Sequence, residues 1–247
     1  MKYMIHGACG HMGQILTQLI AERLPDTDIV PVDANPNCED VYTSPFDFVG
    51  KVDCIIDFSH HSATKTITDY AAATKTPLVL ATTGQTPEEL TCIRAAAELT
   101  QVFFSSNFSV GIAVLVRLAK QAAAAFPDAD IEIVEAHHNR KLDVPSGTAL
   151  TLAKAVQFQR KGSVLNIGRH ENGKRQQNEI GVHSLRMGNV VGMHEIHIST
   201  ATQTLTLRHE AHDRMLFAEG ALAAAAFLIG KPAGLYDMEH LLEEASK

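Results

Sequence analysis

The chain has 247 residues, of which 45% are hydrophobic and 20% charged, and its formal net charge is −7. This composition is typical of a globular protein with one or two cores, and the negative charge argues against nucleic acid or a membrane surface as a partner. No segment provides the roughly 20 apolar residues of a bilayer-spanning helix. The N-terminal sequence MKYMIHGACG enters a glycine motif directly, so we expect no signal peptide and a cytoplasmic location.

The four cysteines are scattered and include no C-x-x-C pair. They are Cys9, Cys38, Cys54 and Cys92. We therefore expect reduced thiols rather than disulfides or a cysteine-rich zinc site.

Short apolar segments alternate with helix-compatible segments through the first 107 residues. The expected strands are 2–8, 28–34, 52–59, 76–84 and 101–107, and the expected helices are 12–23, 63–74 and 87–99. Such alternation predicts βαβ units in a Rossmann-like, doubly wound parallel sheet.

After residue 107 the pattern changes to that of an α+β domain with an open mixed sheet. Helices are expected at 110–126, 146–161 and 213–230, with a strand at 130–138 and a surface loop at 162–177. Three further strands, 178–188, 189–200 and 204–211, are joined by Gly/Asn turns and predict an antiparallel meander.

The sequence GACGHMG at 7–13 has the spacing G-x-x-G-x-x-G between the first strand and the first helix. Such glycines allow a tight turn that approaches a pyrophosphate at a helix N-terminus. Asp33 lies 20 residues beyond Gly13, where an acid binds the adenosine ribose. The alternative is a plain glycine turn with a solvated aspartate, but the βαβ context favours a dinucleotide site. The predicted contacts are Gly7, Ala8, Cys9, Gly10, His11, Met12, Gly13 and Asp33.

The residues after Asp33 bear on cofactor choice. A carboxylate here repels a 2′-phosphate, and Ala34 and Asn35 offer no compensating cation. We therefore predict that NADH is preferred, with NADPH use possible.

The stretch EAHHNRKLDVPSGTA at 135–149 combines titratable side chains with a helix start. His137, His138 and Lys141 can donate protons, and the turn before the helix can hold an anion. The combination indicates an enzyme that acts on a small acid. Two alternatives are a metal site and surface histidines beside a capped helix. Adjacent histidines on a strand point to opposite faces and no zinc-spaced set accompanies them, so we expect no metal.

This stretch closely resembles the signature of the dihydrodipicolinate reductase family of the bacterial lysine pathway, and further similarity covers 188–196, 209–222 and 231–242. The resemblance implies reduction of a cyclic dicarboxylate to tetrahydrodipicolinate with hydride from a nicotinamide. It implies that His137 and Lys141 are catalytic and that His138, Ser146, Gly147 and Thr148 hold the substrate carboxylates. Many members carry an arginine directly after the ribose-binding acid, where this chain has Ala34.

The resemblance also implies a domain organisation and an assembly. It implies a dinucleotide-binding domain at 1–108, on which 215–247 packs back, a substrate-binding and tetramerisation domain at 109–214, and a homotetramer. The residues that it places near the nicotinamide half are Phe58, Ser59, Ala81, Thr82, Thr83, Ser105, Ser106, Asn107 and Phe108.

The implied reaction needs a general acid, because hydride addition leaves an electron-rich carbon on the substrate. Lys141 fits if burial or neighbouring positive charge makes its ammonium a better acid. Alternatively, His137 donates the proton and Lys141 binds a carboxylate. Two other functions fit parts of the chain: another two-domain NAD-dependent dehydrogenase, acting on an amino acid or a semialdehyde, and a non-catalytic dinucleotide sensor.

Overall fold

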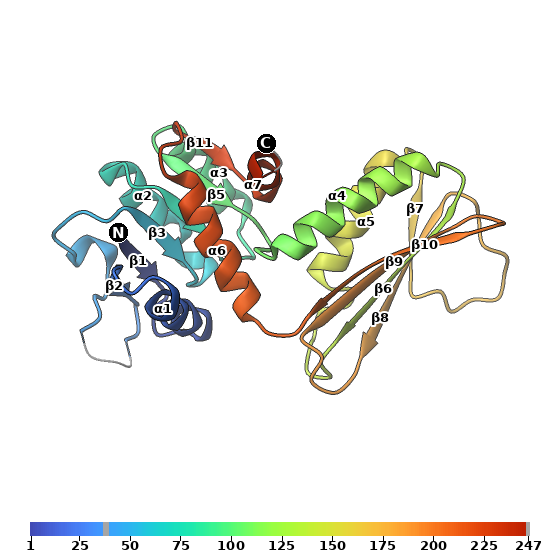
Figure 1. Cartoon of the computed structure of the whole chain (residues 1–247), viewed down its shortest axis with the longest axis horizontal. Coiled ribbons are helices and arrows are strands. Elements are labelled where there is room, and N and C mark those ends of the chain that lie inside the picture. Colours follow the sequence, from blue (N-terminus) through green and yellow to red (C-terminus); the bar gives the residue numbers. More distant parts are fainter. Residues whose placement is uncertain (37–39, 246–247) are drawn as a thin grey trace. The chain divides into compact units, whose positions relative to one another are not determined.

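The computed structural model describes residues 1–36 and 40–245, which form two compact units (Figure 1). Unit 1 consists of Met1–Val110 and Met215–Lys247, and unit 2 of Gly111–Arg214. Cys38 lies outside the described residues, and Cys9, Cys54 and Cys92 form no disulfide with any described residue. In the described part of the chain, no helix is both long enough and apolar enough to cross a membrane.

Unit 1 is built on a six-stranded parallel sheet, which confirms the doubly wound prediction. Its strands, in spatial order, are β11 (Gly234–Tyr236), β5 (Gln101–Phe104), β4 (Leu78–Leu80), β3 (Cys54–Asp57), β1 (Lys2–His6) and β2 (Asp28–Val32). Residues of β3 and β4 are buried throughout, as expected for strands covered on both faces.

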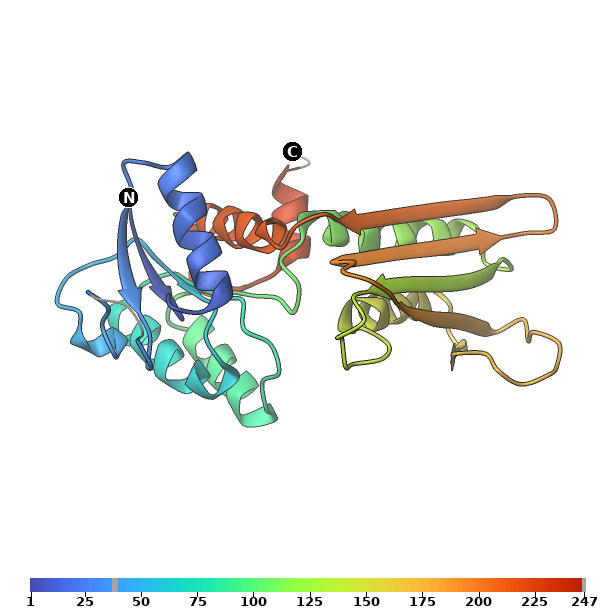
Figure 2. The same ribbon diagram turned by 90° about the horizontal axis from the view of Figure 1, so that it is seen from below.

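Helices cover both faces of this sheet (Figure 2). One face carries α1 (His11–Arg23) and α6 (Met215–Leu228), and the other carries α2 (Thr64–Thr74) and α3 (Pro87–Ala97). A Cβ on Gly220 would lie 1.7 Å from the carbonyl oxygen of Phe108. The absence of a side chain at Gly220 therefore lets α6 pack directly against the backbone at Phe108. Helix α7 (Met238–Ala245) follows α6 and contacts it.

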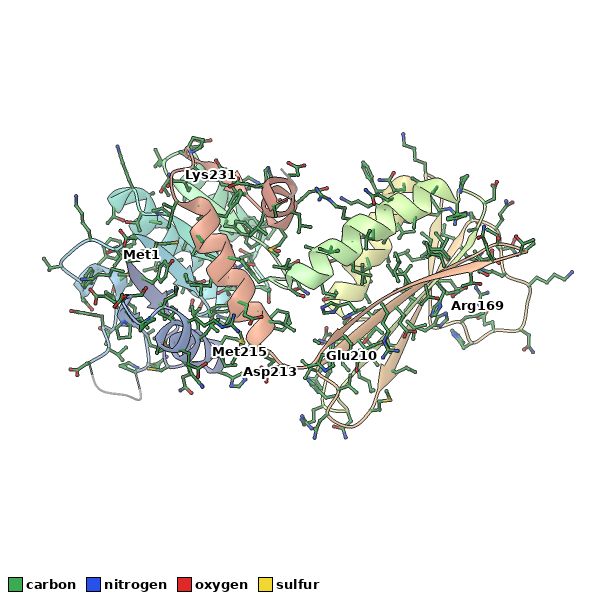
Figure 3. The ribbon with its side chains drawn as sticks, viewed as in Figure 1. Met1, Arg169, Glu210, Asp213, Met215 and Lys231 are labelled. Carbon is green, nitrogen blue, oxygen red and sulfur yellow. The ribbon has the colours of Figure 1, made fainter. Side chains whose placement is uncertain are left out.

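Unit 2 is a five-stranded mixed sheet covered on one face by two helices. Its strands, in spatial order, are β10 (Thr204–Ala211), β9 (Gly192–Ser199), β6 (Asp130–His137), β8 (Glu179–Arg186) and β7 (Val164–Ile167). The edge strand β10 carries Glu210, and Arg169 follows the other edge strand, β7 (Figure 3). Helices α4 (Val110–Ala125) and α5 (Gly147–Gln159) bury their apolar sides against Ile131, Ile133 and neighbouring strand residues.

Two expectations about unit 2 were wrong. The segment 162–177 is not all loop, because it contains β7, a short strand paired with β8. The meander is limited to the β9–β10 hairpin: β6 lies between β8 and β9, parallel to the first and antiparallel to the second. The connection after β8 therefore crosses the end of β6, where Met187 N–H donates to the His137 carbonyl at 2.9 Å.

Candidate active site

The glycine motif forms the turn between β1 and α1. Gly7 has a left-handed φ of +81°, and a Cβ there would lie 2.8 Å from the backbone of Phe58. A Cβ on Gly13 would lie 2.2 Å from the Gly7 carbonyl oxygen. Helix α1 begins at His11, and its N-cap residue, Gly10, provides no side-chain cap for the first N–H groups. A tight turn ahead of an uncapped helix start fits the pyrophosphate of a dinucleotide.

Asp33 follows β2 and is held beside this turn. Its Oδ2 accepts a hydrogen bond from the Cys9 N–H at 3.0 Å, and its Oδ1 accepts one from the Asn35 N–H at 3.0 Å. The carboxylate is therefore fixed in place next to the glycine loop, as a ribose-binding acid must be.

A buried carboxylate, Asp57, connects the ends of three strands of unit 1. Its Oδ1 lies 2.7 Å from His6 Nδ1 and accepts from Ser59 Oγ at 2.6 Å. Its Oδ2 accepts from Thr82 Oγ1 at 2.6 Å. Asp57 is 1% exposed, so these bonds replace its hydration. The network fixes Ser59 and Thr82, two of the predicted cofactor contacts.

The structure brings the predicted cofactor residues together at one edge of the parallel sheet. Phe58 and Ser59 follow β3, Ala81–Thr83 follow β4, and Ser105–Phe108 follow β5, so all lie at the carboxyl ends of strands. This edge is where ligands bind in open α/β sheets.

In unit 2, His137 ends β6 on the face that packs against the helices. Its Nδ1 lies 2.5 Å from Oε2 of Glu135, which is fully buried two residues earlier on the same face. Arg186, at the end of β8, donates to both Glu135 oxygens, at 2.8 and 2.9 Å. Burial acts to raise the pKa of Glu135, but the hydrogen bonds from His137 and Arg186 outweigh it and hold that pKa well below its ordinary value. Glu135 is therefore a carboxylate, and His137 Nδ1–H donates to it.

Ser146 begins α5 beside this pair. Its Oγ accepts from the Ala149 N–H at 3.2 Å, which makes Ser146 the N-cap of this helix. The same Oγ lies 3.2 Å from Nε2 of His194, and the His194 ring packs edge-on to that of His137 with centroids 5.2 Å apart. Burial, and then the proximity of His137, lower the pKa of His194 to about 4, so His194 is neutral at pH 7. Gly147 and Thr148 follow Ser146 in the first turn of the helix.

Lys141 lies on the turn after β6, where its backbone N–H bonds the His138 carbonyl at 3.1 Å. Its Nζ is 2.8 Å from Oδ1 of Asp143, and this ammonium holds the pKa of Asp143 below its ordinary value. Lys141 thus has an acidic neighbour, where the sequence led us to consider burial or cationic neighbours. Burial, and then Arg140, lower the pKa of His138, whose Nδ1 has no hydrogen-bond partner among the described residues.

Four polar residues of these two clusters were given no role in the sequence-based prediction. They are His6, Glu135, Arg186 and His194. Glu135 carried a signal, because the alternation Ile131, Ile133, Glu135 places it on the core face. Arg186 and His194 reach the site from β8 and β9, and the sequence does not reveal how those strands pair with β6. Within residues 1–36 and 40–245, no group of three His, Cys, Asp or Glu side chains could hold a metal ion.

Two family models match the chain. The dihydrodipicolinate reductase N-terminal model matches residues 1–108, and the C-terminal model of the same family matches residues 111–242. The chain belongs to the dihydrodipicolinate reductase family. The resemblance seen in the sequence is therefore confirmed over nearly the whole chain.

Individual members of the family show the same full-length similarity. A 4-hydroxy-tetrahydrodipicolinate reductase from Caldanaerobacter subterraneus subsp. tengcongensis is 41% identical, with 98% of each chain covered. One from Alkaliphilus metalliredigens is 39% identical, with 98% of this chain and 99% of the relative covered.

Solved structures agree on the fold. The dipicolinate-bound dihydrodipicolinate reductase from Paenisporosarcina sp. TG-14 superposes with a TM-score of 0.80 at 25% identity, over 96% of this chain and 97% of that one. The DAP dehydrogenase of C. glutamicum, in complex with DAP, has a TM-score of 0.59 at 14% identity, over 98% and 95%. The second likeness concerns the fold alone, so it does not favour the other dehydrogenase function considered above.

Proposed function

We propose that this chain is an oxidoreductase that reduces 4-hydroxy-tetrahydrodipicolinate (dihydrodipicolinate) to tetrahydrodipicolinate in the diaminopimelate and lysine pathway. Its relatives carry the name of this activity, and the solved family member contains dipicolinate, a related cyclic dicarboxylate. One observation of the site carries the proposal. A buried histidine, His137, shares its carboxylate partner with the start of α5, so a proton carrier lies beside an anion-binding turn.

The segment 1–108, together with 215–247, is the proposed cofactor domain. The glycine turn Gly7–Gly13 would hold the pyrophosphate, Asp33 the adenosine ribose, and Ser59, Thr82 and their neighbours at the strand ends the nicotinamide half. A bound nicotinamide dinucleotide supplies the hydride. We infer a preference for NADH because both oxygens of Asp33 are fixed beside the turn by backbone N–H groups, where a 2′-phosphate would meet their charge.

The segment 109–214 is the proposed substrate domain. The start of α5, at Ser146, Gly147 and Thr148, would bind one substrate carboxylate through the positive end of the helix. His138 and Lys141 would bind the substrate as well, and Lys141 would exchange its exposed partner Asp143 for a substrate carboxylate. Asp143 is 58% exposed, so that ion pair holds Lys141 only weakly.

The geometry favours His137 over Lys141 as the proton donor. Its Nδ1 is committed to Glu135, which leaves Nε2 to carry the transferred proton. In this role, His137 protonates the substrate carbon that hydride addition leaves electron-rich, while Lys141 positions the dicarboxylate.

We further propose a cytoplasmic homotetramer that assembles through the sheet of unit 2. The sheet face opposite α4 and α5 supports this proposal, because it presents the half-exposed apolar side chain of Leu185 on β8, and no described helix of unit 2 covers it.

The activity is tested by coupling the purified chain to the upstream synthase, which generates the substrate, and by following the loss of NADH absorbance. We expect NADH oxidation that depends on the synthase product and is inhibited by dipicolinate. Binding of NADH without turnover would instead identify a dinucleotide sensor.

A further inference from the structure

Glu135 occupies a position that the fold would normally give to an apolar residue. Along β6 the inward-facing residues are Ile131, Ile133, Glu135 and His137, and the first two belong to the core of unit 2. Glu135 itself is 0% exposed. An ionised carboxylate at such a depth is costly unless its lone pairs are all used, so its partners indicate why it is there.

Four N–H donors converge on this carboxylate, two on each oxygen. Oε2 accepts from His137 Nδ1 at 2.5 Å and from Arg186 Nη1 at 2.9 Å. Oε1 accepts from Arg186 Nη2 at 2.8 Å and from the backbone N–H of Ser146 at 3.2 Å. A carboxylate has about four acceptor sites, so Glu135 is saturated. The Arg186 guanidinium, on β8, makes two of the four hydrogen bonds to Glu135. The other two come from His137 and from the Ser146 N–H at the start of α5.

These bonds determine which nitrogen of His137 is available. A carboxylate has no proton to give, so Nδ1 carries its hydrogen whether the ring is neutral or charged. The Nε2 side faces Gly192 on β9, where a Cβ would lie only 3.2 Å from Nε2. Glycine at position 192 therefore leaves space at the nitrogen that Glu135 leaves free.

We infer that Glu135 is a positioning residue that fixes the tautomer of His137. Because Glu135 also accepts from the Ser146 N–H, it holds the proton-carrying ring at a fixed position relative to the carboxylate-binding start of α5. This inference rests on the proposed function for its kinetic consequences, but the tautomer of His137 can be measured without any turnover. Glu135 acts through its two partners, whereas His137 and the α5 turn contact the substrate.

The test uses Glu135→Gln in the full-length chain. An amide preserves the shape but replaces one saturated acceptor by an NH₂ group, so two of the four donors face another donor. We expect kcat/KM to fall by roughly 10²- to 10⁴-fold, as when an acid that orients a catalytic histidine is replaced by its amide. NADH affinity should be unchanged. We also expect His137 to lose its uniform Nδ1–H state in ¹⁵N NMR of histidine-labelled protein, with its signals assigned by their loss in His137→Gln.

Glu132→Gln is a matched control, since Glu132 lies on the same strand and also pairs with a histidine and an arginine. Its Oε2 is 2.8 Å from His183 Nε2 and its Oε1 is 3.1 Å from Arg175 Nε, on the opposite face of the sheet. This variant should keep the wild-type His137 signals. A purely structural role for Glu135 predicts less folded protein but an unaltered His137 tautomer in the folded fraction.

The wild-type NMR spectrum decides the case even where Glu135→Gln does not fold. Neutral His137 that carries its proton on Nε2 would overturn the inference, as would wild-type kcat and KM in a folded Glu135→Gln variant. Failure of the wild-type chain to reduce the substrate would refute the proposed function instead and would leave the tautomer result standing.

Discussion

His6 and Asp57 form a buried pair at the carboxyl ends of neighbouring strands β1 and β3, with Nδ1 2.7 Å from Oδ1. Both residues are at most 5% exposed, and the carboxylate also holds the hydroxyls of Ser59 and Thr82. One acid therefore organises the edge of the sheet where we place the nicotinamide half of the cofactor.

We predict that Asp57→Ala lowers the free energy of unfolding by about 3 kcal/mol, because it leaves His6 and two hydroxyls without their buried acceptor. NADH affinity should fall as well, since Ser59 and Thr82 lose their fixed orientation. Urea unfolding and NADH fluorescence titration measure the two effects. Asp53→Ala is the control: Asp53 is exposed near the start of β3, accepts from the Lys2 N–H at 2.7 Å, and should affect neither quantity strongly. Equal losses in the two variants would refute the role assigned to Asp57.

Asp33→Asn should reduce the preference for NADH over NADPH by about tenfold, or ~1.4 kcal/mol, because it removes the charge that would face a 2′-phosphate. The ratio of kcat/KM for the two cofactors measures this. Asp28→Asn changes an exposed carboxylate at the opposite end of β2 and should leave the ratio unchanged. A wild-type chain that prefers NADPH would contradict our reading of Asp33.

Gly13→Ala should weaken NADH binding by tenfold or more, since the new Cβ, 2.2 Å from the Gly7 carbonyl oxygen, forces α1 away from the turn. Overpacking of this kind costs roughly 1–3 kcal/mol. Gly147→Ala is the counterpart in α5, where a Cβ would meet no atom within 4 Å. That variant should fold at least as stably and bind NADH normally, but raise KM for the dicarboxylate. Isothermal titration and steady-state kinetics separate the two cases.

The stability of unit 2 should depend on pH through His194. Its pKa is about 4 in the folded chain against an ordinary 6.5, so its contribution is complete above pH 6.5 and is lost as the pH falls toward 4. The whole contribution is about 3 kcal/mol, of which about 2 kcal/mol is lost between pH 7 and pH 5.

In His194→Gln, the difference in unfolding free energy between pH 7 and pH 5 should be smaller than in the wild type by about 2 kcal/mol, as measured by urea unfolding. His170→Gln, which replaces an exposed histidine of the same unit, should behave like the wild type. An unchanged pH dependence in His194→Gln would show that this ring is not a buried neutral group.

Much of the fold followed from local pattern in the sequence. The alternation of apolar and helical segments predicted the parallel sheet of unit 1, and the apolar repeats predicted α4, α5 and α6 within a few residues. The sequence-based prediction missed β7, β11 and α7, since segments of three to eight residues carry little periodic signal and β11 is fixed only by pairing with β5. It also missed the insertion of β6 between β8 and β9, which is a long-range pairing that turn residues do not encode.

The residues of the candidate site also fall into those that the local sequence predicted and those that only long-range pairing reveals. The glycine turn, Asp33 and the 135–149 stretch stood out because their chemistry is local in sequence. The groups that hold them in place did not, since Arg186 meets Glu135 across 51 positions and Asp57 meets His6 across the same separation. Only strand pairing brings such partners together, so a sequence reveals the acid or histidine but not what it is bonded to.

The most direct test of the proposed function compares the wild-type chain with His137→Gln in the coupled assay at saturating NADH and substrate. We predict substrate-dependent NADH oxidation by the wild type, and a kcat lower by roughly 10²-fold or more in a variant that still binds NADH. No substrate-dependent oxidation by the wild type, or a wild-type kcat in His137→Gln, would contradict it.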